Sequence, residues 1–289
     1  MRIVAGASNL TCDSTIEELS HRNSPELSSM IRSLTLILYF LAVCVSAHVA
    51  AAQSETEPKE IVDRAIRRIG GPKYLGVTSQ VGRGKFSSLR EGSVVSFQSF
   101  IDVIVFPDKE RTEFKGGKTK FVQTNVGMAG WVFDGDHEVI KEQTEAQIEN
   151  FQRGMRVSLD TLLRGNWKGK GELAYVGKRP ASLGKRNDVV RLKYADGLSV
   201  EYEFADDGTP MKASYKRVDA EGEEVTEEDR YAQWVDINGV LTPFIIDRFT
   251  NGKRSSRINY ESMEYNVRVP DSIFDKPSNI KELKKDLKL

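Results

Sequence analysis

Cysteine and histidine are scarce in this sequence, and most of them lie near its N-terminus. The two cysteines are Cys12 and Cys44, and two of the three histidines are His21 and His48. The chain after residue 52 therefore has no disulfide and no thiol chemistry. A Ser-His or Cys-His nucleophilic site there would have to use its one imidazole, His137.

An excess of either charge is also absent. The chain has 42 Lys and Arg and 42 Asp and Glu, and residues 1–52 contain only three of these bases and four of these acids. A basic excess of the kind that attracts nucleic acid or anionic membranes is therefore missing. We expect no nucleic-acid partner.

Residues 30–52 have the three parts of a secretory signal peptide. Arg32 lies near the start, an apolar run covers 34–45, and small residues lead up to Ala52. The run is shorter than the ~20 residues that a membrane-spanning helix needs. We therefore expect cleavage after Ala52 and a periplasmic protein.

Two other readings concern the same region. Residues 41–44 resemble a lipoprotein cleavage box, so Cys44 could instead carry a lipid anchor, with Val43 standing where a small residue is expected. Residues 1–29 are polar and lack periodicity. We expect them to be a non-structural leader, with the true start at Met30.

Residues 53–277 predict a single domain that begins with a helix. Ile61, Ala65 and Ile69 recur at helical spacing over 58–69, and Gly70-Gly71-Pro72 is a typical helix end. Period-two segments follow, separated by pairs that tolerate positive φ and favour tight hairpin turns. These pairs are Gly116-Gly117, Asp134-Gly135, Asp196-Gly197, Asp207-Gly208, Asn238-Gly239 and Asn251-Gly252. The pattern predicts an antiparallel meander.

One helical stretch interrupts the strands. Residues 138–163 lack proline and place apolar side chains three to four apart, so we expect a helix that covers the apolar face of the sheet. Residues 278–289 are rich in lysine and are expected to form a charged, solvated C-terminal tail.

The segment from Phe100 to Phe106 is apolar on both faces of a strand. Its even positions are Phe100, Asp102, Ile104 and Phe106, and its odd positions are Ile101, Val103 and Val105, so both faces are largely hydrophobic. Such a strand is buried on both sides or faces a cavity. Plain core packing is the commoner reason for this pattern.

Catalytic and metal-binding patterns are weak. Asp134, Asp136 and His137 could ligate a metal, but the segment reads first as a turn. The acidic residues 223–224 and 227–229 could act as a glycosidase pair, but they lie in a charged stretch that favours a solvated hairpin tip. We expect no catalytic residue, no metal and no cofactor.

Several segments, in this order, resemble the periplasmic lipoprotein-carrier superfamily, which includes LolA-like and LolB-like proteins and outer-membrane lipoprotein-sorting proteins. The resemblance covers most of 58–277. The matching segments are Arg68-Ile69-Gly70-Gly71, 105–111, 130–135, 175–178, 236–244 and 270–277.

The resemblance implies an α+β, mainly β fold: a strongly curved antiparallel sheet that forms an incomplete barrel and is covered by helices. It also implies a cavity for acyl chains under a lid. On this template the lid is 138–163, and the candidate pocket residues are Phe100, Ile104, Phe106, Trp131, Phe133, Ile148, Phe151, Leu159 and Leu162.

One position departs from the family. The well-known carriers have an arginine before the proline of this strand, where it latches the lid, and here Phe106 precedes Pro107. Arg111 is the nearest arginine that could serve a similar purpose.

The leading hypothesis is a non-enzymatic, monomeric periplasmic carrier of a lipid or acylated protein, with a membrane donor or acceptor protein as a further partner. An envelope signalling or protein-interaction module on the same fold is the alternative. An enzyme comes third.

Overall fold

Thirteen antiparallel strands form one sheet in the part of the chain that the computed structural model describes, which is residues 57–117, 119–219, 221–285, 287 and 289. The expected signal peptide, its cleavage after Ala52 and Cys44 lie outside these residues. The strands are β1 (Ser79–Arg90), β2 (Ser93–Val105), β3 (Lys109–Gly116), β4 (Thr119–Val126), β5 (Ala129–Asp134), β6 (Val139–Glu142), β7 (Gly171–Pro180), β8 (Arg186–Tyr194), β9 (Ser199–Phe204), β10 (Pro210–Val218), β11 (Glu224–Ile237), β12 (Val240–Thr250) and β13 (Lys253–Tyr265).

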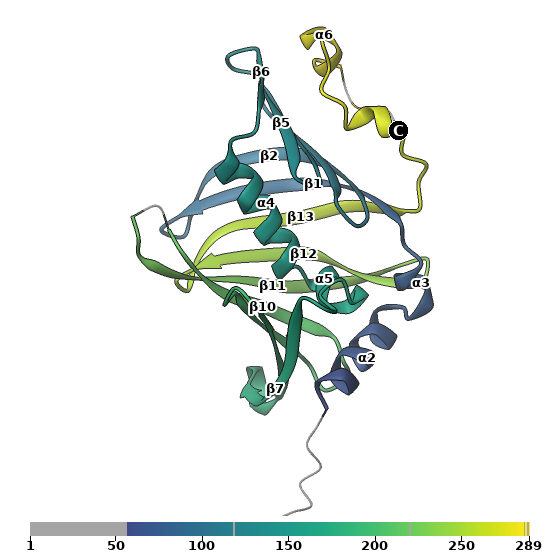
Figure 1. Cartoon of the computed structure of the whole chain (residues 1–289), viewed down its shortest axis with the longest axis vertical. Coiled ribbons are helices and arrows are strands. Elements are labelled where there is room, and N and C mark those ends of the chain that lie inside the picture. The colour runs from purple at the N-terminus through teal and green to yellow at the C-terminus, as the bar shows by residue number, and fades with distance from the viewer. Residues whose placement is uncertain (1–56, 118, 220, 286, 288) are drawn as a thin grey trace, which may run out of the picture. The chain divides into compact units, whose positions relative to one another are not determined.

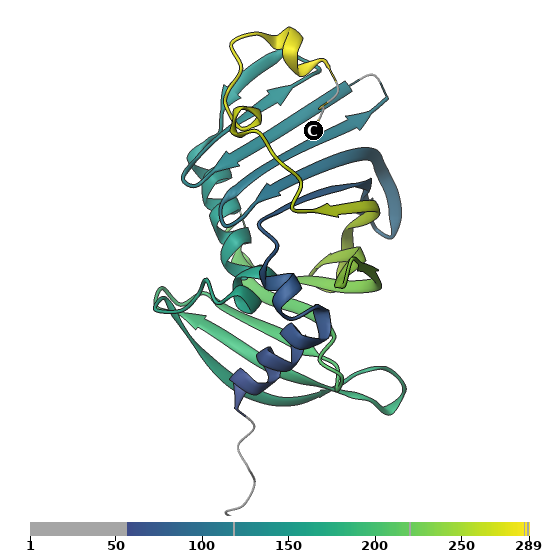
Figure 2. The same cartoon turned by 90° about the vertical axis from the view of Figure 1, so that its right-hand side faces the viewer.

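The sheet curves strongly but does not close. Its order is β6-β5-β4-β3-β2-β1-β13-β12-β11-β10-β9-β8-β7, so β6 and β7 are its two edges (Figures 1 and 2). Each half is a meander, and the pairing of β1 with β13 joins them. The expected mainly β fold with an incomplete antiparallel barrel is confirmed.

Glycines bring the two halves together where β1 meets β13. A Cβ on Gly84 would lie 2.1 Å from the backbone oxygen of Asn259, and one on Gly82 would lie 2.5 Å from the ring of Tyr260. Only glycine permits this approach, and it leaves the concave side of β1 open to the Tyr260 ring.

The short helices are α2 (Pro58–Ile69), α3 (Pro72–Leu75), α4 (Glu145–Val157), α5 (Leu159–Arg164) and α6 (Ile280–Leu283), with 3₁₀ turns at Ser182–Gly184 and Asp271–Ile273. The bounds of α2 are those that the sequence predicted. Its apolar stripe, including Ile61 and Ala65, is fully buried against α5 and strands β8 and β9 in the main core.

The prediction of a single helix over 138–163 is wrong, because this stretch forms β6, α4 and α5. Glu138 has a positive φ of 52° in the turn before β6, which pairs with β5. Thr144 and Gln147 then form a capping box at the start of α4. Ser158 breaks the helix, because its extended backbone and its hydroxyl, which accepts from the Thr161 N–H, begin α5.

The concave face of the sheet is the one that faces the helices. In Figure 1, α4 crosses in front of β2, β1, β13 and β12, and it carries the chain from the β6 edge toward the β7 edge. The main core fills the concave side of β8–β11 beneath α2 and α5.

The convex face of β1–β5 is covered by the C-terminal segment, residues 267–285 and 287. Phe274 packs on Val81 and Val103, and Leu283 packs with Trp131 and Phe133. The yellow segment follows this side of the strands in Figure 2. Residues 278–289 were expected to be a solvated tail; this is wrong for Leu283, which is 2% exposed because it covers an apolar part of the sheet.

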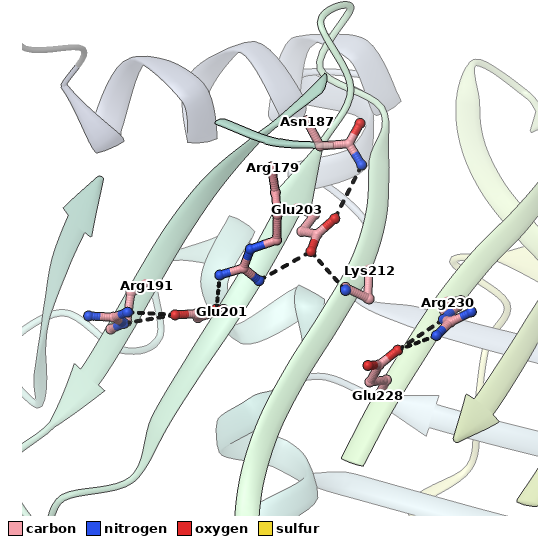
Figure 3. Close-up of polar contacts among 8 residues, drawn as sticks. All are labelled: Arg179, Asn187, Arg191, Glu201, Glu203, Lys212, Glu228 and Arg230. Carbon is pink, nitrogen blue, oxygen red and sulfur yellow. Dashed lines mark hydrogen bonds and ion pairs between the residues drawn. The ribbon is translucent and has the colours of Figure 1, made fainter. Parts of the chain in front are cut away.

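The convex face of β7–β11 has charged side chains instead. Glu203 is bonded to Arg179, Lys212 and Asn187, and Glu201 to Arg179 and Arg191 (Figure 3). Such cross-strand pairs satisfy a sheet face that contacts water. The two halves of the sheet therefore differ on their convex side.

Candidate functional site

A cavity of about 630 Å³ lies on the concave face, beside the main core. Its walls come from β1, β2, β3, β11, β12 and β13, and from α4 and α5 on the opposite side. This volume is within the range of pockets that hold a small ligand.

Four aromatic rings line one part of the cavity. Phe114 is 5.5 Å from Phe86 and 6.4 Å from Phe100, and Phe100 is 5.4 Å from Tyr260, measured between ring centroids. These side chains alternate inward on β1, β2, β3 and β13. They form an apolar wall that is rigid because each ring contacts another.

Carboxyl groups project into the same cavity from β2 and β3. Asp102 is 8% exposed, and its Oδ1 lies 2.7 Å from the hydroxyl of Thr112 on the neighbouring strand. The same hydroxyl lies 3.3 Å from Oε1 of Glu110. A hydroxyl has one hydrogen to donate, so it can serve only one of these two carboxyls at a time.

Burial dominates the titration of these groups. Burial and, to a smaller extent, the nearby Glu110 raise the pKa of Asp102 to about 8, although the hydrogen bond from Thr112 and the charge of Arg248 act to lower it. Burial also raises the pKa of Glu110. Both carboxyls are therefore held toward their neutral form in the absence of a further partner.

Arg248 of β12 also lines the cavity and faces Asp229 of β11. Their Nε and Oδ1 atoms are 3.5 Å apart, and the two residues are directly opposite in the strand register. Arg248 keeps 49% of its side-chain surface accessible while it lines the cavity. Enclosure raises the pKa of Asp229, and Arg248 offsets part of that effect.

Helix α4 is held mainly at its C-terminal end. Arg156 pairs with both carboxylate oxygens of Asp196 at 2.7 and 2.8 Å, and Tyr202 donates to the backbone oxygen of Val157 at 3.1 Å. Val157 is the only buried residue of the helix. The rest of α4 therefore covers the cavity with few buried contacts.

Helix α5 is tied to the start of the sheet by Arg164. Its Nη1 donates to the backbone oxygen of Val77 at 2.9 Å, and its Nε donates to Asp160 at 3.0 Å. The guanidinium also lies 3.9 Å from the ring centroid of Phe106 and 4.7 Å from that of Tyr74. An arginine thus links helix and strand, but it comes from the helix and stacks on the phenylalanine that stands before Pro107.

Arg111 does not take part in this link. It lies on the convex face, where it donates to Glu113 and to the backbone oxygen of Ile273 in the C-terminal segment. The expectation that Arg111 could latch the lid is therefore wrong.

Five of the residues predicted for the pocket line the cavity. They are Phe100, Ile104 and Phe106 from the sheet, Phe151 from α4 and Leu159 from α5. That they contact a ligand remains a prediction.

The other four predicted residues lie elsewhere. Leu162 is 1% exposed within the main core, and Ile148 is half-buried on α4 away from the lining. Trp131 and Phe133 are on the convex face, so their assignment to the cavity is wrong. The register explains this, because Trp131 aligns through Thr124 and Arg111 with Val103, and residues that lie opposite share a face.

The polar residues of the cavity were missed by sequence reasoning. Asp102 was visible as the one charged residue within 100–106, and this was the available signal. Glu227 and Asp229 were assigned to a solvated hairpin tip, which is wrong, because alternate residues of β11 face the cavity while Glu228 pairs with Arg230 on the convex side.

His137 lies in the turn between β5 and β6. Its Nδ1 is 2.7 Å from Asp134 and its side chain is exposed, and the hydrogen bond to His137 lowers the pKa of Asp134. Among the residues that the structure describes, no group of three or more His, Cys, Asp or Glu is arranged to hold a metal. Within the same residues, no helix has the length and apolarity to cross a membrane.

The described residues thus form a curved open sheet with a cavity under helices. Neither the protein-family models nor the curated proteins give a match to this chain. Solved structures do. The chain is similar to a DUF1329 family protein from Desulfovibrio piger, with a TM-score of 0.55 and 16% identity over 76% of this chain and 98% of the other.

Two further similar structures are of proteins described as lipoprotein-sorting or LolA-superfamily proteins. One is a putative outer membrane lipoprotein-sorting protein domain from Vibrio parahaemolyticus, with a TM-score of 0.51, 11% identity, and 79% and 100% of the two chains covered. The other is a LolA superfamily protein from Nitrosomonas europaea, with a TM-score of 0.50, 16% identity, and 75% and 97% covered. The fold of this chain is therefore LolA-like, as the sequence resemblance implied.

Proposed function

We propose that this protein is a non-enzymatic carrier of a hydrophobic ligand, a lipid or the acyl chain of a lipoprotein, and that it works in the periplasm. The single observation that supports this most is the cavity of about 630 Å³ on the concave face. Its lining is mostly apolar and aromatic, as in sites that enclose an acyl chain.

The energetics favour such a ligand. Each methylene moved from water into an apolar cavity contributes about 0.8 kcal/mol, so an acyl chain gains several kcal/mol on binding. Release then requires the cavity to open. The lightly buried helix α4 is the element that would move, with its hinge at Ser158, where the extended backbone separates it from α5.

The position of Gly154 gives a test. This glycine is in the last turn of α4 and lines the cavity, and a Cβ added to it would meet no atom within 4 Å. Gly154→Trp should therefore place an indole in the ligand space. It should not destabilise the fold, because glycine costs a helix interior roughly 0.5–1 kcal/mol relative to alanine.

The experiment uses the full chain expressed in a Gram-negative bacterium and purified from the envelope fraction. Native mass spectrometry should find an acyl lipid on the parent protein and on the control Glu149→Trp, which changes an exposed residue of the same helix. It should find none on Gly154→Trp. The proposal fails if the parent neither carries a lipid nor takes one up from vesicles, or if Gly154→Trp binds equally well.

The same preparation separates the other classes. A protein partner that co-purifies equally with the parent and with Gly154→Trp would favour a signalling or interaction module. A hydrolytic activity that disappears when His137 is replaced would favour an enzyme.

A further inference from the structure

The acidic part of the cavity has too few hydrogen-bond donors for its carboxyl groups. Asp102 and Glu110 share the single hydroxyl hydrogen of Thr112. Among the described residues, no Lys, Arg or His nitrogen lies within 4.0 Å of either carboxyl. Neither carboxyl has an oxygen that is both fully enclosed and without a partner, so their open hydrogen-bonding positions are accessible from the cavity.

Asp102 gives the second observation. Its side chain is more than nine-tenths buried and lines the cavity, and Thr112 contacts only its Oδ1. Oδ2 is left without a donor among the described residues. A carboxylate oxygen that has no protein donor and is accessible from the cavity is a position that a ligand donor can occupy.

The neighbouring cation does not remove the shortage. Arg248 lies near enough to lower the pKa of both carboxyls, but its closest carboxylate is Asp229, at 3.5 Å. Glu227 has its own partner in Arg217, at 2.6 Å. The cations Lys109 and Arg164 of the lining likewise pair with other carboxylates, Asp271 and Asp160, so Asp102 and Glu110 have no ion-pair partner among the described residues.

The aromatic rings around Asp102 fit the same kind of ligand. Phe100 and Phe114 are the inward neighbours of Asp102 and Thr112 along their strands, and Tyr260 contacts Phe100. The negative faces of such rings attract an ammonium group. An anionic head group would instead meet two carboxyls, and the cation of the cavity that acts on both of them, Arg248, already pairs with Asp229.

We infer that the cavity takes an amphiphile with a positively charged amine, whose N–H groups bind Asp102 and Glu110 while its hydrocarbon chain lies along the apolar wall. This inference rests on the proposed function and adds the chemistry of the ligand's head group. An ammonium has three donors, enough for both carboxyls at once. The site would thereby discriminate between ligands that have the same hydrocarbon chain but different head groups.

The experiment compares three probes with the same chain: decylamine, decanol and decanoate. Each is titrated calorimetrically into the delipidated full-length protein in a mildly alkaline, low-salt buffer. Decylamine should bind at least about tenfold more tightly than decanol, and decanoate should bind most weakly.

The variant Asp102→Asn combined with Glu110→Gln should remove this preference, while its affinity for decanol stays within about twofold of the parent. Glu228→Gln, on the convex side of β11, is the matched control and should keep the preference. Circular dichroism at each titration temperature checks that the double variant is folded.

The outcomes separate the two proposals. If none of the probes binds and no lipid is recovered from the envelope, the proposed function itself fails. If the probes bind equally, or if the double variant keeps the preference for the amine, only the inference about the head group is overturned. If decanoate binds best, Arg248 and not the acidic pair contacts the head group.

Discussion

Replacing Asp102 with Asn should change how stability depends on pH. The pKa of Asp102 is about 8 in the native protein because the side chain is buried next to Glu110. In an unfolded chain an aspartate titrates near pKa ~3.9. Between these values the native protein holds a proton that the unfolded chain has lost.

The sign follows from this difference. Stabilisation by the bound proton is complete below about pH 4, decreases as the pH rises, and is lost above about pH 8. For one group the free energy of unfolding should fall by about 1.4 kcal/mol per pH unit over the middle of this range. Asp102→Asn cannot ionise and should lack this contribution.

Urea unfolding of the parent and of Asp102→Asn, at several pH values between about 5 and 7, measures this contribution to the free energy of unfolding. The difference between their free energies of unfolding reports the titration of Asp102 together with its coupling to Glu110, because the other titratable groups are present in both proteins. Asp247→Asn is a control, since Arg257 lowers the pKa of Asp247 on the convex face. Its difference from the parent should be constant over this range. Parallel curves for the parent and Asp102→Asn would refute the reasoning.

Two further predictions concern the segments that cover the sheet. Arg164→Met removes the hydrogen bond to Val77 and the contact with Phe106, so it should lower the free energy of unfolding by about 2 kcal/mol and speed hydrogen exchange in α5. Unchanged exchange would show that the arginine does not hold the helix. Leu283→Ala should cost about 2 kcal/mol and change the fluorescence of Trp131, because the side chain is buried beside it. If neither the free energy of unfolding nor the fluorescence changed, the sequence-based prediction that the C-terminal residues form a solvated tail would be restored.

The architecture could be predicted from the sequence because its signals are local. The pairs Asn238-Gly239 and Asn251-Gly252 both have positive φ at each residue, as tight hairpins require, and each lies between strands that pair. The first helix ends where its glycines allow the chain to turn. Such features depend on neighbouring residues only.

The site was predictable only in part, because it depends on register. The apolar period of β5 is the same whichever face it presents, so Trp131 could be assigned to the cavity until its alignment with Val103 was known. Ser158 breaks the long helix through a cap that competes with continuation. The meeting of Asp102 with Glu110 and Thr112 depends on the pairing of β2 with β3.

The most direct test of a carrier function is a crystal structure of the full chain purified with its bound lipid. We predict continuous density for a hydrocarbon chain in the cavity between the sheet and α4, in contact with Phe106 and Leu159 and with its polar end at Asp102. Density for a lipid only on the outer surface, or a cavity closed by the side chains of α4, would contradict this account.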